Sequence, residues 1–413
     1  MSTDTDTASA ATAAPPLSPA RTRLALLALA LGGFGIGATE FVAMGLLPQI
    51  AHDLLPAAWT TSPDDAIAQA GVVIGAYALG VVVGAPTIAI FAARLPRRSI
   101  LLALTLLFTL GTVASAVAPT FPLVVLFRFL AALPHGAYFG IAALVAASLM
   151  GPGKRGQGVA LVLSGLTVAN VIGVPLITFL GQQSGWRAAY LVVAAIFAAS
   201  VIAIRLTVPK QPGDPDATPR RELGAFRRPA VWFALLTGSV GFAGFFAVYS
   251  YVAPLTTEVT LLPASAIPWA LVTLGLGMTL GNLLGGWAAD RSVMRALFAS
   301  FAVFAVMLLG LALTAPQPIG LFGFLFGVGA AAAALSPAIQ TRLMDVAGES
   351  QTLAAAVNHS ALNIGNALGA FLGGAVIAAG WGYLAPTWLG LVMCAPGILL
   401  ALGGMAVTRR RTS

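Results

Sequence analysis

The chain has 413 residues, of which 59% are apolar and only 8% are charged, and its mean hydropathy is +0.94. Soluble domains carry about 25% charged residues, so this composition excludes an ordinary soluble protein and is typical of an integral membrane protein. The single cysteine, Cys394, excludes an internal disulfide framework and a cysteine-based metal cluster.

The first segment of the chain, residues 1–20, is rich in Ser, Thr, Ala and Pro and contains no basic residue, which predicts a disordered tail. It lacks the basic region and cleavage pattern of a secretory signal peptide, so we expect none here. Twelve apolar runs follow, each about 20–29 residues long and therefore long enough to cross a bilayer as a helix. The runs cover residues 24–47, 67–91, 99–118, 121–149, 157–180, 187–208, 230–254, 267–289, 294–314, 318–340, 352–379 and 385–407.

Basic residues lie almost entirely in every second connection between these runs. With the N-terminus in the cytoplasm, all but two of the 21 lysines and arginines fall in cytoplasmic segments. The exceptions are Arg187, on the outside, and Arg128, within a span. The positive-inside rule therefore predicts that both chain ends are cytoplasmic. The net charge of +8 then reflects membrane orientation, and we expect no nucleic-acid partner.

An internal repeat relates the two parts of the chain at an offset of about 197 residues. Charged residues at matching loop ends argue against chance similarity between apolar helices. The matched pairs are Gly80 with Gly277, Gly84 with Gly281, Arg94 with Arg291, Arg98 with Arg295, Ser164 with Ser360, and Asn170 with Asn366. Two six-helix halves related by a parallel repeat are the architecture of the major facilitator fold, which holds its substrate between the halves.

The predicted fold is therefore an all-α integral membrane protein with twelve transmembrane helices in two pseudo-symmetric six-helix bundles. The longest charged connection lies between the two halves. The predicted parts are a disordered cytoplasmic tail over 1–20, an N-terminal bundle over 21–208, a cytoplasmic central loop over 209–229, a C-terminal bundle over 230–408, and a basic cytoplasmic tail over 409–413.

Glu40 and Arg128 are the only acidic and the only basic residue well inside the predicted spans. At 1.5 Å per helical residue, both lie roughly 9–11 Å below the outer membrane boundary, so we expect them to approach each other. A buried acid is favoured as an ion by a nearby arginine and as a neutral group by desolvation, which suits a group that exchanges protons. The alternatives are a static ion pair and an acid that only holds helices together.

His135 is a third candidate for proton coupling, because imidazole titrates near neutral pH. It stands between Pro134 and Gly136, so the alternative is a histidine that only fills a helix kink. No other group of residues predicts a metal site or a catalytic centre, and the three histidines of the chain are scattered.

The sequence resembles the bacterial arabinose-inducible and chloramphenicol-resistance exporters in four stretches: GFGIGATEFVAMGLLPQIA (33–51), YALGVVVGAP (77–86), LPHGAYFG (133–140) and SGLTVANVIGVPL (164–176). These exporters are twelve-helix drug:proton antiporters of the major facilitator superfamily. The resemblance covers the chain after the N-terminal tail. It implies residence in the bacterial cytoplasmic membrane, a small-molecule substrate, protons as the coupling ion, and a monomer.

The family's motifs match this sequence unevenly. The loop motif Gly-x-x-x-Asp-Arg-x-Gly-Arg-Arg lacks its acid in the first half, where Ala93 stands, whereas its second copy retains the acid. The antiporter motif of the fifth helix is matched by Gly165 and Gly173, but Ala169 and Asn170 replace its Gly-Pro pair. The resemblance implies a cytoplasmic gate formed by Arg94, Arg97, Arg98, Asp290 and Arg291.

Polar and aromatic residues on several spans are candidates for a substrate cavity, although such residues also serve only to pack helices. His359, Asn363 and Asn366 recur at helical spacing on one face of the eleventh span. Aromatic rings can hold a planar apolar ligand. The predicted cavity residues are Phe34, Phe41, Tyr138, Asn170, Tyr249, Tyr251, His359, Asn363 and Asn366.

The favoured function is secondary active transport, in which small and fairly apolar compounds leave the cell in exchange for protons. Proton-coupled transport of sugars or metabolites shares the fold and is the first alternative. A membrane enzyme acting on lipids is the second, and it would need clustered acids, a metal site or a nucleophile–base pair. The chain has no Gly-rich phosphate loop ending in Lys-Ser/Thr, so we expect no cofactor and a proton gradient as the energy source.

Overall fold

The computed structural model describes residues 18–92, 95–151, 155–213, 224–347 and 351–412, and within these ranges it contains helices and no strand. The helices up to residue 207 form what we call the N-terminal half. They are α1 (Pro19–Gly45), α2 (Leu47–Leu54), α3 (Pro56–Thr61), α4 (Pro63–Ala70), α5 (Val72–Ala92), α6 (Arg97–Val117), α7 (Phe121–Ala132), α8 (His135–Met150), α9 (Arg155–Val168), the π-helix η1 (Ala169–Gly173), α10 (Val174–Ser184) and α11 (Trp186–Thr207).

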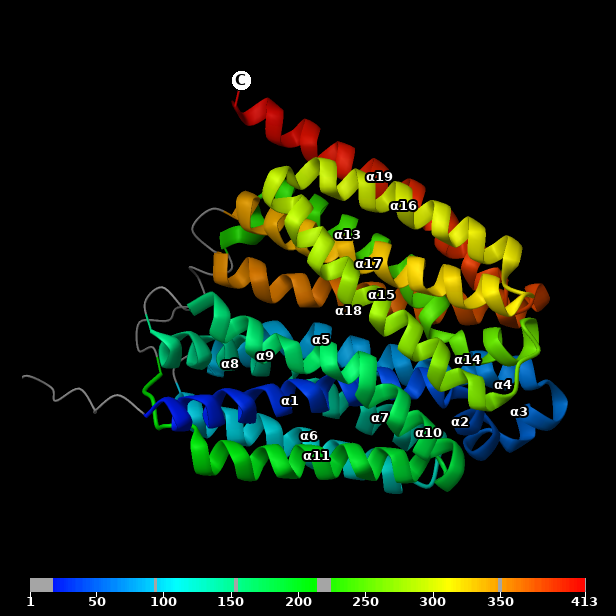
Figure 1. Ribbon diagram of the computed structural model, residues 1–413, viewed down its shortest axis with the longest axis horizontal. Helices are drawn as coiled ribbons and strands as arrows, with labels where there is room; N and C mark the ends of the chain where they lie inside the picture. Colours follow the sequence, from blue (N-terminus) through cyan, green and yellow to red (C-terminus); the bar gives the residue numbers. More distant parts are fainter. Residues whose placement is uncertain (1–17, 93–94, 152–154, 214–223, 348–350, 413) are drawn as a thin grey trace, which may run out of the picture.

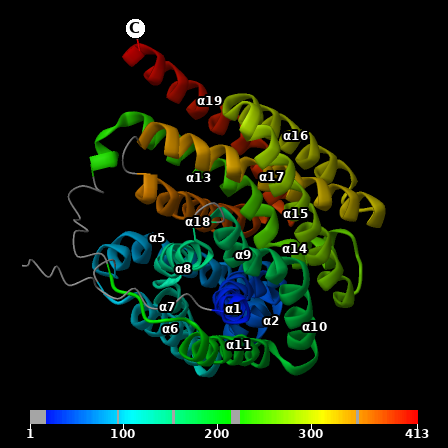
Figure 2. The same ribbon diagram turned by 60° about the vertical axis from the view of Figure 1, so that its left-hand side comes forward.

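The helices from residue 224 onward form the C-terminal half, which lies beside the N-terminal half in Figures 1 and 2. They are η2 (Gly224–Arg227), α13 (Pro229–Ser250), α14 (Val252–Pro254), η3 (Leu255–Val259), η4 (Ala264–Ala266), α15 (Ile267–Arg291), α16 (Val293–Thr314), α17 (Pro318–Ala347), α18 (Gln351–Val376), η5 (Ile377–Trp381) and α19 (Ala385–Thr412).

Twelve helical segments of the described chain are long and apolar enough to cross a membrane, and they coincide with the twelve predicted runs. The predicted fold class is thereby confirmed. Helix α1 begins, and α19 ends, at the left of Figure 1. We call this side of the molecule the terminal end and the opposite side the far end.

The two halves repeat one set of helix contacts. In the N-terminal half, α1 packs on α9 and α11, α5 packs on α7 and α8, and α6 packs on α7 and α11. In the C-terminal half, α13 packs on α18 and α19, α15 packs on α17, and α16 packs on α17 and α19. The halves meet mainly where α5 lies against α18 and where α10 and η1 lie against α15.

Close helix contacts preserve the repeat residue by residue. A Cβ atom on Gly84 would lie 2.5 Å from the Leu133 Cα, and one on Gly281 would lie 2.7 Å from the Ala330 Cα. Both glycines therefore allow two helix backbones to touch, which is how small residues drive association in membranes. The repeat in the sequence therefore corresponds to a repeat in helix packing.

Several predicted continuous spans are interrupted in the structure, and two of them are interrupted near their middle. The fourth span divides into α7 and α8 at Leu133, just before Pro134, whose ring removes a helical donor and clashes with the preceding turn. The fifth span passes through the π-helix η1, which contains Asn170 and precedes Pro175. Single π-turns of this kind are frequent at functional sites.

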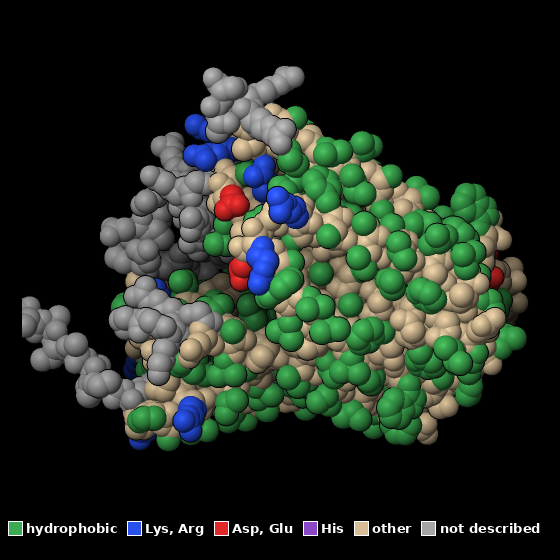
Figure 3. Space-filling model, turned by 45° about the horizontal axis from the view of Figure 1, so that its top comes forward, with side chains coloured by type: hydrophobic (Ala, Val, Ile, Leu, Met, Phe, Trp, Pro, Cys, Tyr) green, Lys and Arg blue, Asp and Glu red, His purple; other side chains and the backbone are tan. Residues whose placement is uncertain are grey.

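The outer surface of the molecule fits a lipid environment. Figure 3 shows apolar side chains over most of one face, with basic side chains gathered near the terminal end. Large apolar residues remain exposed on many helices, for example Leu206 on α11 and Phe371 on α18. A soluble protein would hide such contiguous apolar surface, whereas lipid tails cover it without penalty.

The predicted connections differ in detail from the structure. The connection after α1 forms three short helices, α2 to α4, at the far end, which the apolar pattern did not predict. Of the predicted tail over 1–20, residues 1–17 lie outside the described chain, and α1 already begins at Pro19. Residues 214–223 of the central loop also lie outside it. Helix α19 continues through the predicted basic tail to Thr412.

The packing of α15 on α17 generates a test of the repeat contact. Gly281→Leu would force a side chain into the Ala330 backbone and should cost about 1–3 kcal/mol or more of stability. Gly286→Leu, on the same helix, is the matched control, because a Cβ there meets no atom within 4 Å. We expect a lower thermal unfolding midpoint in detergent for Gly281→Leu alone; equal midpoints for both variants would contradict the close contact.

Candidate functional site

Glu40 is held inside α1, where its side chain is only 2% exposed. Its Oε1 accepts a hydrogen bond of 3.4 Å from Nδ2 of Asn366 on α18, so the acid of the N-terminal half is tied to the C-terminal half. Its other carboxyl oxygen, Oε2, lies 4.0 Å from Nδ1 of His135 on α8. A carboxyl buried this deeply requires such polar neighbours, because a bare charge in an apolar medium is very costly.

Arg128 lies beside Glu40 but binds the neighbouring residue. Its Nη1 donates to the Thr39 carbonyl oxygen at 2.7 Å and contacts the Thr39 hydroxyl at 3.2 Å. The guanidinium carbon lies 4.3 Å from the ring centre of Tyr77 and 5.5 Å from that of Tyr190, which are cation–π distances. The expected approach of Arg128 to α1 therefore occurs, but Arg128 forms no ion pair with Glu40.

His135 is buried at the start of α8 and connects three helices. Its Nδ1 shares a hydrogen bond of 3.3 Å with the Tyr77 hydroxyl of α5. Its ring centre lies 6.2 Å from that of His359 on α18, and the Phe139 ring stacks on His359 at 5.5 Å. The kink at Pro134 places this histidine at the boundary between the halves instead of on a lipid-facing side.

A central cavity of about 240 Å³ lies between the halves and begins at Glu40. Residues from both halves line it, including polar side chains from α15, α17 and α18. The lining residues are Glu40, Phe41, His135, Leu163, Leu166, Thr167, Asn170, Phe242, Phe245, Phe246, Met278, Asn282, Ala332, Ala333, Ser336, Pro337, Gln340, Asn358, His359 and Leu362. Asn358 and Gln340 lie near the terminal ends of α18 and α17, so the cavity extends from Glu40 toward the terminal end.

Aromatic rings close the inner end of the cavity beside Glu40. The Phe41 ring stacks on Tyr249 at 5.4 Å and on Phe246 at 6.3 Å between ring centres. Phe245 lies 5.1 Å from Phe246 in an edge-to-face arrangement. Rings from α1 and α13 thus form an apolar wall next to a single acid, and such a wall suits a planar apolar ligand.

Hydrogen bonds between the halves are found at the depth of Glu40 and toward the far end. The Tyr249 hydroxyl donates to Oδ1 of Asn170 at 3.4 Å. At the far end, Gln182 Nε2 donates to the Ala264 carbonyl at 2.9 Å, and the Tyr383 hydroxyl donates to Oδ1 of Asp64 at 2.7 Å. Burial and the bond to Asp64 raise the pKa of Tyr383, so its hydroxyl remains a donor at neutral pH.

Four of the predicted cavity residues lie away from the cavity wall. The Tyr138 hydroxyl donates to the Leu29 carbonyl, and Phe34 packs against Gly173, so both residues fill contacts within the N-terminal half. Tyr251 donates to the Ala370 carbonyl near the far end, and Asn363 donates to the carbonyl of its own helix at His359. Phe41, Asn170 and His359 line the cavity, while Asn366 and Tyr249 bind residues that line it.

The predicted gate residues lie at the terminal end and are not joined across the halves within the described chain. Arg98 donates to the Arg205 carbonyl at 2.8 Å, and the Arg97 backbone N–H donates to Gln211. Arg291 lies over the Trp287 ring of its own helix, and Asp290 is exposed. Arg94 lies outside the described residues.

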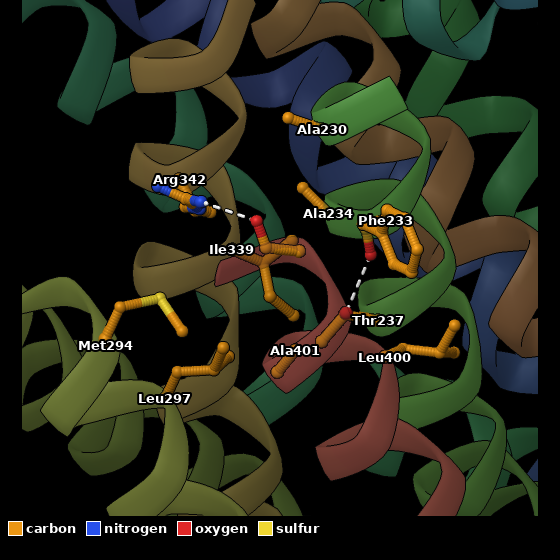
Figure 4. Close-up of a pocket in the computed structure, with 11 residues that line it drawn as sticks. Ala230, Phe233, Ala234, Thr237, Met294, Leu297, Ile339, Arg342, Leu400 and Ala401 are labelled. Atoms are coloured by element: carbon orange, nitrogen blue, oxygen red, sulfur yellow. Dashed lines mark hydrogen bonds between the residues drawn. The ribbon is translucent and has the colours of Figure 1, made fainter. Parts of the chain in front are cut away.

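Other hollows in the molecule differ from the central cavity in chemistry. Figure 4 shows a void at the terminal end of the C-terminal half, near Arg342 and Thr237, whose volume of about 10 Å³ suits at most one water. Its Thr237 hydroxyl is already bound to the Phe233 carbonyl at 2.7 Å. A groove of about 870 Å³ between α5, α7 and α18 is almost wholly apolar. Neither hollow combines a buried acidic residue with a space large enough for a ligand.

Several site residues escaped the sequence prediction. Tyr77 forms a hydrogen bond with His135, and Thr39 accepts one from Arg128. The sequence does not predict such partners, because a tyrosine or threonine within an apolar run does not indicate which residue it will contact. Asn282, Gln340 and Asn358 line the cavity and were polar residues within predicted spans, so a systematic search for such residues would have found them. No group of three or more His, Cys, Asp or Glu in the described residues could hold a metal ion.

Comparison with known proteins assigns the chain to a family. A family model described as Major Facilitator Superfamily matches residues 29–262 and 252–413. The chain therefore belongs to the major facilitator superfamily, whose members are membrane transporters of small molecules and not enzymes. The lipid-modifying enzyme considered from the sequence is excluded by this membership.

Relatives and solved structures agree with this assignment. The chain is 41% identical over 377 residues to the inner membrane transport protein YdhP of Escherichia coli (strain K12), covering 91% of this chain and 94% of that protein. It is 32% identical to a chloramphenicol resistance protein of Streptomyces lividans, covering 92% and 95%. A D-xylose-proton symporter structure shares the fold with a TM-score of 0.75 at 16% identity, covering 92% and 97%.

The position of Arg128 predicts the behaviour of a double variant. Arg128→Ala removes the cation next to Glu40 and should lower stability by about 3 kcal/mol, because a buried acid loses its compensating charge. Adding Glu40→Gln should recover part of this loss, since no charge then remains. The measurement is the yield of monodisperse protein in detergent, with Arg187→Ala at the partly exposed surface pair with Asp53 as control. A double variant no more stable than Arg128→Ala would contradict the electrostatic link.

The bond between Tyr383 and Asp64 predicts how the far end opens. Tyr383→Phe removes the donor and should shift the equilibrium toward opening of the far end by about 1 kcal/mol. A cysteine placed at Phe41 should then react faster with an impermeant thiol reagent added from the far side. Asp53→Asn is the matched control, because the partners of Asp53 among the described residues, Trp186 and Arg187, belong to its own half. Unchanged labelling in Tyr383→Phe would refute a closing role for this bond.

Proposed function

We propose that this protein exports small, fairly apolar compounds across the cytoplasmic membrane of a bacterium in exchange for protons. One observation carries the proposal: Glu40, a carboxyl buried at the boundary between the halves, lines the same cavity as a wall of aromatic rings. Substrate bound in the cavity would then lie next to the carboxyl that carries the proton, so binding of one could displace the other. An intramembrane acid is expensive to keep and is most often retained for ion coupling.

The aromatic wall favours the substrate class. Phe41, Phe245 and Phe246 offer flat apolar surface, and Asn170 and Gln340 offer a few hydrogen bonds for orientation. This combination fits a small aromatic compound better than a sugar, which needs many polar partners. One relative is named for chloramphenicol resistance, and chloramphenicol is therefore the first compound to test. Proton-coupled symport of sugars or metabolites remains the second candidate on fold alone.

The proposed mechanism is rocking of two rigid bodies around the central cavity. The bundles are those predicted over 21–208 and 230–408, joined by the loop over 209–229. The bonds at Gln182 and Tyr383 close the far end, while the cavity extends toward the terminal end. Among the described residues Asp290 has no partner across the halves in this arrangement, and we propose that it gains one, together with Arg97, Arg98 and Arg291, when the terminal end closes.

The orientation in the membrane follows from the charges. Arginines and lysines at the terminal end support a cytoplasmic location for both chain ends, with the far end outside the cell. The cavity of the present structure would then open toward the cytoplasm, ready to take up a compound for export.

A transport assay with Glu40→Gln tests the proposal. Glutamine keeps the shape and can still bond to Asn366, but it cannot release a proton. In proteoliposomes, we expect proton-driven movement of radiolabelled chloramphenicol by the original protein and none by Glu40→Gln. The control is Asp53→Asn, an exposed acid at the far end. Undiminished proton-driven efflux by Glu40→Gln would reject the coupling role, and comovement of proton and compound would favour symport.

A further inference from the structure

Two histidines face each other across the boundary between the halves, and each belongs to a different half. His135 lies at the start of α8, and His359 lies on α18. Their ring centres are 6.2 Å apart, and both side chains line the central cavity that begins at Glu40. His135 is 2% exposed, whereas His359 is partly exposed and lies nearer the terminal end of its helix.

The geometry points to a proton relay that runs from Glu40 through His135 to His359 and ends in the cavity on the terminal-end side. This inference rests on the proposed proton coupling and adds His359, together with the order of transfer, to that function. His359 thereby becomes a residue that transfers protons instead of one that contacts the transported compound.

The first step of the relay joins Glu40 and His135. The Glu40 Oε2 lies 4.0 Å from Nδ1 of His135, which is too long for direct transfer and suits one bridging water. The cavity that both side chains line has a volume of about 240 Å³, far above the ~10–15 Å³ that a water needs. The Glu40 O–H proton passes to the water as the water gives a proton to Nδ1, which leaves a carboxylate and an imidazolium.

The second step joins the two imidazoles. Nδ1 of His135 faces Glu40 and the Tyr77 hydroxyl, so Nε2 is the nitrogen that remains to release the proton. Water carries that proton to a ring nitrogen of His359, which leaves His135 neutral with its hydrogen on Nδ1. Proton exchange with water restores the form with hydrogen on Nε2 before the next transfer. His359 then releases the proton to water in the cavity. Each transfer moves one proton, and no group other than these three and water is required.

The residues around His135 and His359 favour proton transfer between the two histidines and do not form a permanent ion pair with His359. The ionisable groups that face His135 are Glu40 from α1, Tyr77 from α5 and His359 from α18, with Arg128 of α7 behind the Tyr77 ring. His359 faces His135, and the apolar Phe139 ring covers one side of it. No carboxylate within the described residues makes an ion pair with His359, so nothing there holds a proton on it permanently.

The chain contains only three histidines, which makes the relay directly observable. We would label histidine with ¹⁵N and follow the ring signals of the full-length protein in lipid nanodiscs between pH 5 and 9. The third histidine, His52, is exposed at the far end and serves as the internal control. A relay requires that His135 and His359 both exchange protons, and that the titration curve of each changes when the other is replaced by glutamine.

The expected result is a changed His359 curve in both His135→Gln and Glu40→Gln, with the His52 curve unchanged. Curves for His135 and His359 that stay independent, or that show no protonation across this range, would overturn the relay. Coupled curves in a protein that shows no proton-driven transport would instead overturn the proposed export function and leave the relay intact. The two failures are therefore distinguishable.

Transport by His359→Gln separates a relay from a substrate-binding role. Proton-driven movement of chloramphenicol should fall by about 100-fold, the lower end of what a positioned proton-transfer group contributes. Exchange of labelled for unlabelled chloramphenicol needs no net proton movement and should fall far less than the proton-driven movement does. Equal losses of both activities would assign His359 to substrate binding or to structure and would overturn its place in the relay. His52→Gln, which should alter neither activity, is the matched control.

Discussion

The hydrogen bond between Glu40 and Asn366 is the interaction on which this architecture depends. It joins the first helix of one half to α18 of the other at a depth where an isolated carboxyl would be strongly unfavourable. Asn170, the repeat equivalent of Asn366, makes the corresponding bond to Tyr249 on α13. An asparagine of each half therefore bonds to the first long helix of the other half.

The repeat is symmetric in packing and asymmetric in chemistry. Gly84 and Gly281 bring equivalent helices into backbone contact, so both halves share one rigid framework. The asparagine of one half bonds to an acid, however, while that of the other accepts a hydrogen bond from the Tyr249 hydroxyl. The acid, Arg128 and His135 all belong to the N-terminal half. The residues for which we propose proton coupling therefore lie mainly in the N-terminal half, and the C-terminal half supplies their partners, aromatic surface and His359.

The twelve spans, the internal repeat and the buried acid were all predictable from the sequence, because span length, the spacing of matched residues and the cost of a buried charge are local properties. The partners of Glu40 were not, since Asn366 and His135 approach it only after the halves pack together. The expected pair between Glu40 and Arg128 shows why. The sequence placed the two residues at a similar depth in the membrane, but the Arg128 guanidinium donates to the Thr39 carbonyl and not to the Glu40 carboxyl. The π-turn at Asn170 and the roles of Tyr138 and Tyr251 likewise depend on tertiary contacts.

The central claim is that Glu40 is the point at which proton and substrate meet. Its most direct test is to add chloramphenicol to the purified protein in weakly buffered detergent solution and to record proton release with an indicator dye. Release of up to one proton for each bound molecule, which disappears in Glu40→Gln while binding persists, is the predicted result. Binding without proton release at any pH between 6 and 9, or release that persists in Glu40→Gln, would contradict the account.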